Sequence, residues 1–174
     1  RKKVQSNTER TLSQLNVDFF DYKPNFDVVR KLMIESFYRR GDFCWHCHVG
    51  ISSLPINIAI EKGIPLIFYG EPSAEYASYY DYSEAEDLNV EKFNKVINLG
   101  INAEDMLGMI NERFPNEKIK IEDLKPYIFP TERELKKNNI KACYLGNYIP
   151  WNVKDQVKII KDELGWEGDT VEGI

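Results

Sequence analysis

Apolar residues recur at helical spacing over several stretches of the chain. Over residues 27–40 they recur at three- and four-residue steps, which predicts an amphipathic helix that ends at Gly41. Residues 44–62 are apolar on most turns up to Gly63, so a second helix is expected there. Further segments that predict helices are residues 91–97, 103–113 and 153–164.

Short apolar segments between these helices predict strands. Residues 17–22 have the apolar and aromatic character of a strand, which Lys23-Pro24-Asn25 would stop. Residues 64–69 are suited to a buried parallel strand, and residues 140–148 are expected to be a strand or a turn-rich segment. Because strands alternate with helices, we expect an α/β fold, a parallel sheet flanked by helices, in a single domain over residues 1–174.

Local polar signals refine this expectation. Ser6-Asn7-Thr8-Glu9 could cap a short helix that runs through Leu15, and residues 131–134 have the order of a capping box. Residues 126–130 are expected to be extended. Residues 73–89 hold four tyrosines among small and acidic residues, which indicates an irregular or short helical excursion that packs on the sheet's edge.

Composition and charge narrow the classes of function. The 174 residues are 43% hydrophobic and carry a net charge of -5, so the chain lacks the basic surplus typical of nucleic-acid binding. No apolar run approaches the roughly 20 residues that span a bilayer, and the basic start has no signal-peptide stretch after it. We therefore expect a cytoplasmic protein without a membrane partner, in which nucleic acid is an unlikely ligand.

Thiols and imidazoles cluster at the start of the second predicted helix. Cys44, His46, Cys47 and His48 lie within five residues and could converge on one ion, although buried cysteines equally often act as small apolar residues. Cys143 would add a third thiol and leave one position open on Zn²⁺ or an iron-sulfur cluster. The candidate metal ligands are therefore Cys44, Cys47 and Cys143, with the roles of the two histidines left open.

Polar residues also follow the predicted parallel strand. Gly70, Glu71 and Glu75 come directly after it, and ligands of open parallel sheets gather outside the carboxyl ends of the strands. Carboxylates suit Mg²⁺, so these three residues are candidates for binding ATP with Mg²⁺. The alternative is an acidic surface loop.

An aromatic segment precedes the last predicted helix. Its candidate substrate-binding residues are Tyr144, Asn147, Tyr148 and Trp151, because aromatic faces bind sugars and an amide can bind hydroxyl or acetamido groups. On pattern alone, stacking inside the core is the commoner use of such rings. Neither type of glycine-rich phosphate loop occurs in the chain, so a nucleotide site cannot be completed within it.

Two blocks of sequence resemble the N-acetyl sugar amidotransferases of lipopolysaccharide and surface-glycan biosynthesis. The first is Cys44-Trp45-His46-Cys47-His48-Val49-Gly50 with residues 64–71 and Glu75-Tyr76. The second is Tyr144-Leu145-Gly146-Asn147-Tyr148-Ile149-Pro150-Trp151 with residues 165–169. Together the blocks span most of the chain from Cys44 onward.

The resemblance implies the fold and chemistry of the PP-loop ATP pyrophosphatases, which have an adenine nucleotide alpha-hydrolase-like sheet. ATP would adenylate the acetamido oxygen of a nucleotide-linked N-acetyl sugar, and ammonia would then displace AMP to leave an acetamidino group. A glutaminase subunit and a cyclase-like subunit would supply the ammonia, and Glu71 and Glu75 would lie near Mg²⁺. Because the phosphate loop that follows the family's first strand has no counterpart here, we expect this chain to be the C-terminal portion and to hydrolyse no ATP alone.

Two other functions stay open at this point. The three cysteines are similar to those of PP-loop enzymes that thiolate tRNA, which hold zinc or an iron-sulfur cluster with such a trio. The missing phosphate loop also fits a non-catalytic module that binds a metal or docks a partner.

Overall fold

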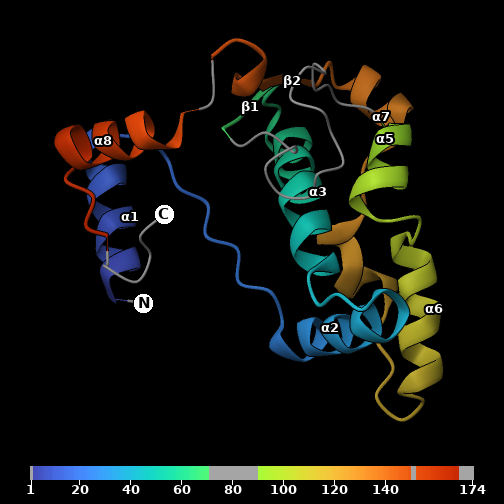
Figure 1. Ribbon diagram of the computed structural model, residues 1–174. Coiled ribbons are helices and arrows are strands. Elements are labelled where there is room, and N and C mark those ends of the chain that lie inside the picture. The colour runs from blue at the N-terminus through green and yellow to red at the C-terminus, as the bar shows by residue number, and fades with distance from the viewer. Residues whose placement is uncertain (1, 71–89, 150–151, 169–174) are drawn as a thin grey trace. The chain divides into compact units, whose positions relative to one another are not determined.

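The computed structural model describes residues 2–70, 90–149 and 152–168 (Figure 1). They form two compact units, one within Arg1–Lys23 and Pro150–Ile174 and the other within Pro24–Ile149. The expectation of one domain over the whole chain stays a prediction. Among the described helices, none is long and apolar enough to cross a membrane.

The larger unit is mostly helical and contains a small two-stranded parallel sheet, so the expected mixture of α and β is confirmed. In chain order its elements are α2 (Phe26–Arg40), α3 (Trp45–Lys62), β1 (Leu66–Tyr69), α5 (Val90–Lys92), the π-helix η1 (Phe93–Ile97), α6 (Ala103–Arg113), the 3-10 helix η2 (Ile121–Tyr127), α7 (Glu132–Lys137), β2 (Lys141–Tyr144) and the 3-10 helix η3 (Leu145–Asn147). The finer expectation of an adenine nucleotide alpha-hydrolase-like sheet stays a prediction.

Helix α2 begins and ends at local signals in the sequence. The Asn25 side chain accepts a hydrogen bond from the backbone N–H of Asp27 at 2.9 Å and caps the first turn. Gly41 ends the helix with φ 69°, a left-handed conformation that glycine adopts without steric cost. Both bounds agree with the predicted helix.

The core of the larger unit forms around the first half of α3. Trp45 and Val49 are fully buried there against residues of α2, α6 and η2, among them Leu32, Met106 and Leu124. The indole N–H of Trp45 donates to the backbone oxygens of Asn98 (3.2 Å) and Ile101 (3.1 Å). Burial of an aromatic ring this large, with its polar atom satisfied, makes Trp45 the anchor of α3.

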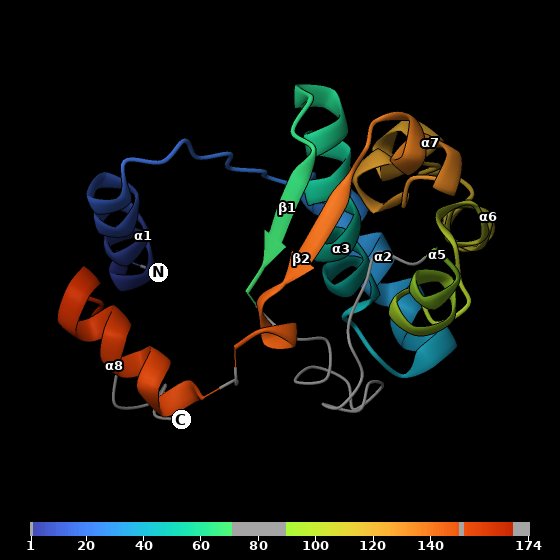
Figure 2. The same cartoon turned by 90° about the horizontal axis from the view of Figure 1, so that it is seen from above.

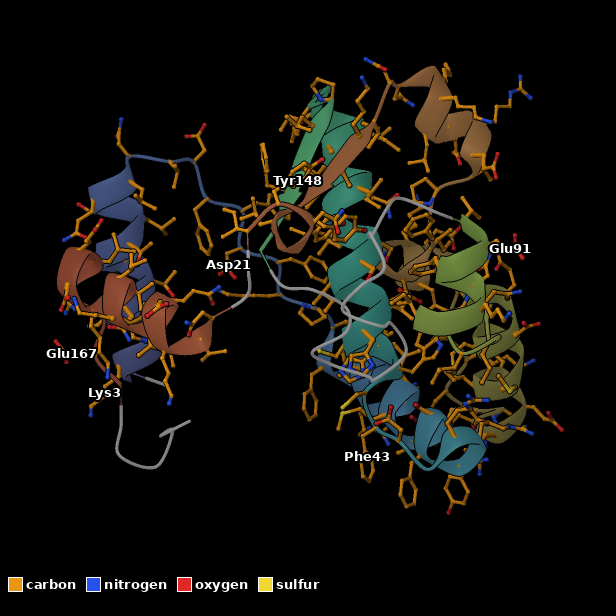
Figure 3. All side chains as sticks on the ribbon, turned by 45° about the horizontal axis from the view of Figure 1, so that its top comes forward. Lys3, Asp21, Phe43, Glu91, Tyr148 and Glu167 are labelled. Carbon is orange, nitrogen blue, oxygen red and sulfur yellow. The ribbon has the colours of Figure 1, made fainter. Side chains whose placement is uncertain are left out.

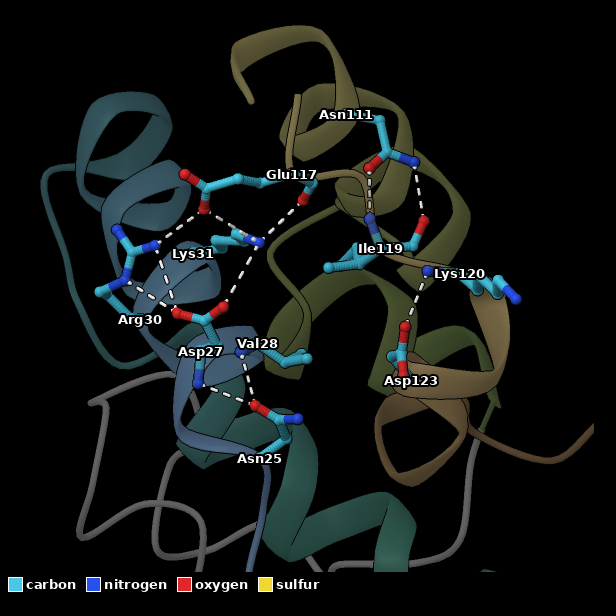
Figure 4. Close-up of polar contacts among 10 residues, drawn as sticks. All are labelled: Asn25, Asp27, Val28, Arg30, Lys31, Asn111, Glu117, Ile119, Lys120 and Asp123. Atoms are coloured by element: carbon cyan, nitrogen blue, oxygen red, sulfur yellow. Dashed lines mark hydrogen bonds and ion pairs between the residues drawn. The ribbon is translucent and has the colours of Figure 1, made fainter. Parts of the chain in front are cut away.

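Two clusters of charged residues join α2 to the segments beside it. At the start of the helix, Lys31 is buried, and its Nζ lies 3.8 Å from the Asp27 carboxylate and 3.4 Å from that of Glu117 (Figure 4). At the end of the helix, the buried Glu35 carboxylate accepts hydrogen bonds from Arg39, at 2.8 Å, and from Arg113 of α6.

The two strands lie side by side, and α3 covers one face of the sheet (Figure 2). Ile67 faces α3, where it packs against the cluster that contains Ile56 and Ala59. Leu66 and Phe68 point to the other face and are 45% and 61% exposed. The expected parallel strand is therefore confirmed, but its expected burial is wrong, because within the described residues only one face of the sheet is covered.

Two predictions in the N-terminal part of the chain are wrong. Residues 17–22 form no strand, because no described segment pairs with them, and Phe19 and Phe20 are 58% and 57% exposed. Residues 6–9 do not cap a helix, since α1 (Lys2–Leu15) already runs through them, whereas the expected end of this helix at Leu15 is confirmed. There the Asn7 side chain binds a distant backbone segment.

The expectations for residues 126–134 are confirmed in part. Pro126 lies inside η2 and is not extended, whereas the capping box at the start of α7 is present. In that box Thr131 N donates to the Glu134 carboxylate at 2.8 Å, and Glu134 N donates to Thr131 Oγ1 at 3.3 Å. The excursion expected over residues 73–89 lies outside the described residues.

The smaller unit pairs α1 with α8 (Val153–Leu164), which ends as expected at Gly165 with φ 60°. Asn7 exchanges two hydrogen bonds with the backbone of Glu167: its Nδ2 donates to Glu167 O at 2.9 Å, and Glu167 N donates to its Oδ1 at 3.0 Å. Arg10 donates to Gly165 O and to the Glu167 carboxylate. These contacts hold the segment after α8 against α1.

Candidate functional site

The carboxyl ends of β1 and β2 meet at one edge of the sheet. The register pairs Leu66 with Lys141 and Tyr69 with Tyr144, so both strands end level with each other (Figure 2). Gly70 and residues 145–149, which come from the two blocks of the family resemblance, therefore leave the sheet at the same edge. Among the described residues, no atom lies within 4 Å of the position that a Cβ on Gly70 would take.

Stacked tyrosines form the end of this sheet. The rings of Tyr69 and Tyr144 lie 4.9 Å apart with an interplanar angle of 14°. The Tyr69 hydroxyl donates to the backbone oxygen of Ser52 in α3 at 3.2 Å. Burial raises the pKa of Tyr69 to about 12, which keeps the phenol neutral at physiological pH. The stacked pair thus ends the sheet, and its Tyr69 phenol is anchored to α3.

The segment after β2 presents polar and aromatic side chains to solvent. The short helix η3 contains the exposed Asn147, and Tyr148 follows it with a side chain that is 74% exposed. Tyr148 N donates to Leu145 O at 3.0 Å, which closes this turn. Figure 3 shows Tyr148 beyond the carboxyl end of β2, away from Phe43 at the end of α2.

Three of the predicted site residues lie outside the described part of the chain, namely Glu71, Glu75 and Trp151. The described residues at the edge, Gly70 and residues 145–149, contain no carboxylate and so offer no such ligand to Mg²⁺. The binding of ATP with Mg²⁺ at this edge stays a prediction.

The Cys-x-x-Cys pair lies at the start of α3. Cys44 is the N-cap residue, Cys47 lies in the first turn, and both are exposed. Partial burial and the neighbouring Asp42 carboxylate raise the pKa of Cys44. Cys44 N–H also donates to Asp42 Oδ1 at 2.9 Å, which fixes the cap.

His46 and His48 flank Cys47 on the same helix. His46 Nδ1 is buried and has no hydrogen-bond partner within the described residues. Burial lowers the pKa of His46, so its imidazole is neutral at physiological pH. Neither histidine completes a metal-binding group, because the described ranges contain no set of three or more His, Cys, Asp or Glu side chains that could hold an ion.

The third predicted thiol is separated from this pair. Cys143 is the register partner of Phe68, and register partners share a face, so Cys143 lies on the face of the sheet opposite to α3. The structure does not bring the three cysteines together. The three-cysteine metal site and the tRNA-thiolating function therefore stay predictions from the sequence, to which the described residues add no support.

Sequence reasoning missed two residues that shape these sites. The apolar pattern predicts only that Tyr69 ends a strand, although the last residue of a parallel strand borders the edge where ligands bind. The same kind of pattern gives no role to Asp42, two residues before Cys44. A short acidic residue just before a helix start is a common signal for local hydrogen bonding, and this signal identifies Asp42.

Comparisons with known proteins do not identify a family. No family model matches the chain, and no curated protein matches it either.

Proposed function

We propose that the carboxyl edge of the sheet binds the acetamido sugar of a nucleotide-linked substrate for an ATP-dependent amidotransferase of glycan biosynthesis, in the cytoplasm. The observation that carries this proposal is the parallel register of β1 and β2, which gathers Gly70 and residues 145–149 at one edge. Parallel sheets bind their ligands at that edge. Gly70 and Leu145, which are 75 positions apart in the chain, thereby lie at one edge of the sheet, as a shared substrate site requires.

The chemistry follows from the reactivity of an amide. The acetamido oxygen is a poor leaving group; it attacks the α-phosphorus of ATP, pyrophosphate leaves, and the oxygen now carries AMP, which is a good leaving group. Ammonia, supplied by a glutaminase subunit and a cyclase-like subunit, then adds to the carbonyl carbon of the acetamido group, and AMP leaves. The phosphate loop that this adenylation needs would come from outside this chain, so the role that we assign to the chain is to hold and orient the sugar.

Four side chains divide this role. The rings of Tyr69 and Tyr144 are stacked, and the Tyr69 phenol is neutral, so it does not repel a nucleotide's phosphates. The exposed ring of Tyr148 can stack on a sugar face, and the exposed amide of Asn147 can exchange hydrogen bonds with an acetamido group. We propose no metal-dependent step at these residues.

Binding of matched probes tests the proposal. UDP-N-acetylglucosamine and UDP-glucose differ at the acetamido group, and their affinities for the chain can be compared by calorimetry or ligand-observed NMR. We expect the acetamido sugar to bind more tightly, and Tyr148→Ala to weaken it about tenfold, as loss of one stacking ring implies. Phe26→Ala removes another highly exposed ring, away from the sheet edge, and should change nothing.

A second measurement concerns turnover. The full-length enzyme with its glutaminase partner should release AMP only when an acetamido sugar nucleotide is present, and Tyr148→Ala should lower kcat/KM. Equal binding of both sugar nucleotides, or AMP release that ignores the acetamido group, would exclude the proposal.

A further inference from the structure

We propose that Cys44 and Cys47 form a redox-active dithiol that closes to an intramolecular disulfide by exchange with a small-molecule disulfide such as oxidised glutathione. This site is separate from the sheet edge and does not depend on the function proposed there.

Backbone geometry places the two thiols within reach of each other. Cys47 N and His48 N donate to Cys44 O at 2.9 and 3.0 Å, so the segment is a regular turn of helix. Residues three apart in such a turn have Cα atoms about 5 Å apart. This separation lies inside the range of about 4.4–6.8 Å that a disulfide requires. A Cys-x-x-Cys pair at the start of a helix therefore needs no large backbone movement to close.

Accessibility and rigidity favour exchange at this pair. Both cysteines are exposed, so a small disulfide can reach either sulfur. Trp45, between them, is fully buried and is held by two backbone oxygens, which fixes the turn. Because the second cysteine lies one helical turn away in the same chain, ring closure competes well against a second molecule of glutathione.

The two steps balance in atoms and electrons. The thiolate of one cysteine attacks a sulfur of oxidised glutathione, forms a mixed disulfide and releases one glutathione thiolate. The other cysteine loses its proton and attacks the protein sulfur of that mixed disulfide. The bond between the two cysteines forms, and a second glutathione leaves. The protein loses two electrons and two protons, which the glutathione disulfide takes up.

Thiol trapping and mass spectrometry test the proposal on the full chain. The protein is equilibrated anaerobically with mixtures of reduced and oxidised glutathione at mildly alkaline pH, quenched in acid and alkylated. We expect two thiols to be lost together as the oxidised fraction rises, with no glutathione attached, and both to return when reduced glutathione is added. Cys143→Ser is the matched control, and it should show the same midpoint.

Single variants distinguish ring closure from simple oxidation. Cys44→Ser and Cys47→Ser should each retain one glutathione on the remaining thiol of the pair, because no second thiol can displace it. Circular dichroism checks that both variants keep their helices. The proposal is overturned if Cys44 and Cys47 both stay alkylatable in excess oxidised glutathione. It is also overturned if, in the wild type, each of these two cysteines carries its own glutathione. Stoichiometric zinc or iron on the pair in anaerobically purified protein would also overturn it.

Discussion

The two ends of α2 hold their charges in opposite arrangements. At the start of the helix the cation is inside: the Lys31 side chain is 5% exposed, whereas its partners Asp27 and Glu117 are 63% and 56% exposed. At the end the carboxylate is inside: Glu35 is fully buried, and Arg39 and Arg113 are 46% and 32% exposed. The buried lysine and the buried carboxylate therefore differ in how strongly each depends on its exposed partners.

The difference lies in what each buried group retains if its outer partners are lost. Lys31 also donates to the backbone oxygen of Glu117 at 2.8 Å, and a long flexible side chain can carry its ammonium group to water. Glu35 depends on two guanidinium groups, and its short side chain cannot reach solvent from the buried face. We therefore expect the end of α2 to be the more sensitive site.

The largest effect is expected from removing both cationic partners of Glu35. The double variant Arg39→Met and Arg113→Met keeps the apolar stems but leaves a buried carboxylate without a cation. The free energy of unfolding should fall by about 3 kcal/mol, the scale of an uncompensated buried charge. Urea denaturation measures it, and Arg40→Met, an exposed arginine at the same end, is the control that should be silent. An unchanged midpoint in the double variant would refute the comparison.

Acid should act on the end of α2 in a defined direction. Burial alone would raise the pKa of Glu35, but hydrogen bonds from Arg113 and Arg39 outweigh it and hold that pKa below its ordinary value of 4.5. Because the folded pKa is the lower one, this carboxylate stabilises the fold above about pH 4.5, and the stabilisation is lost as the pH falls through the folded value.

This pH dependence can be isolated with Glu35→Gln. The variant should be less stable than the wild type near neutral pH, and the two stability curves should converge in acid. Glu134, whose pKa the Thr131 hydrogen bonds also lower, contributes an equal background to both proteins. Curves that stay parallel down to strong acid would show that Glu35 carries no such stabilisation.

A smaller effect is expected at the cap of α2. Asn25→Ala removes the side-chain acceptor for the first turn and should cost about 1 kcal/mol of unfolding free energy. Asn25→Ser keeps an acceptor and should recover most of this loss. If serine fails to recover it, the cost arises from something other than capping.

The smallest effect is expected from the outer carboxylates at the start of α2. Asp27→Asn with Glu117→Gln should lower the free energy of unfolding by about 0.5 kcal/mol, because exposed partners are well solvated and Lys31 keeps its backbone acceptor. Thermal denaturation at low and high salt measures this term. A loss equal to that of the arginine double variant would mean that burial of the cation and burial of the carboxylate are equivalent here.

Local sequence signals predicted several helix bounds, because the causes of these bounds lie within a few residues. Asn25 and Gly41 bound α2, and Thr131 with Glu134 starts α7, each through contacts of one turn. The strands were harder to predict because a strand exists only where a partner pairs with it. Residues 17–22 have the composition of a strand but no described partner strand, so the strand predicted from composition alone is wrong.

The candidate sites depend on register, which local patterns do not contain. A shift of one residue between β1 and β2 would move Cys143 to the face of α3, so its separation from Cys44 and Cys47 could not be predicted from spacing. Gly70 and residues 145–149 lie at the same edge because of the same strand pairing. The rule that parallel strands bind ligands at their carboxyl ends did point to Gly70 in advance.

The hydrogen bonds between Asn7 and Glu167 join residues that are 160 positions apart in the chain. During synthesis α1 leaves the ribosome long before the segment after α8 exists, whereas every residue of the larger unit lies in the continuous stretch Pro24–Ile149. Domains usually form in the order in which they emerge. Because α1 precedes the larger unit in the chain and α8 follows it, α1 cannot form its contacts with α8 and Glu167 until the larger unit has been synthesised.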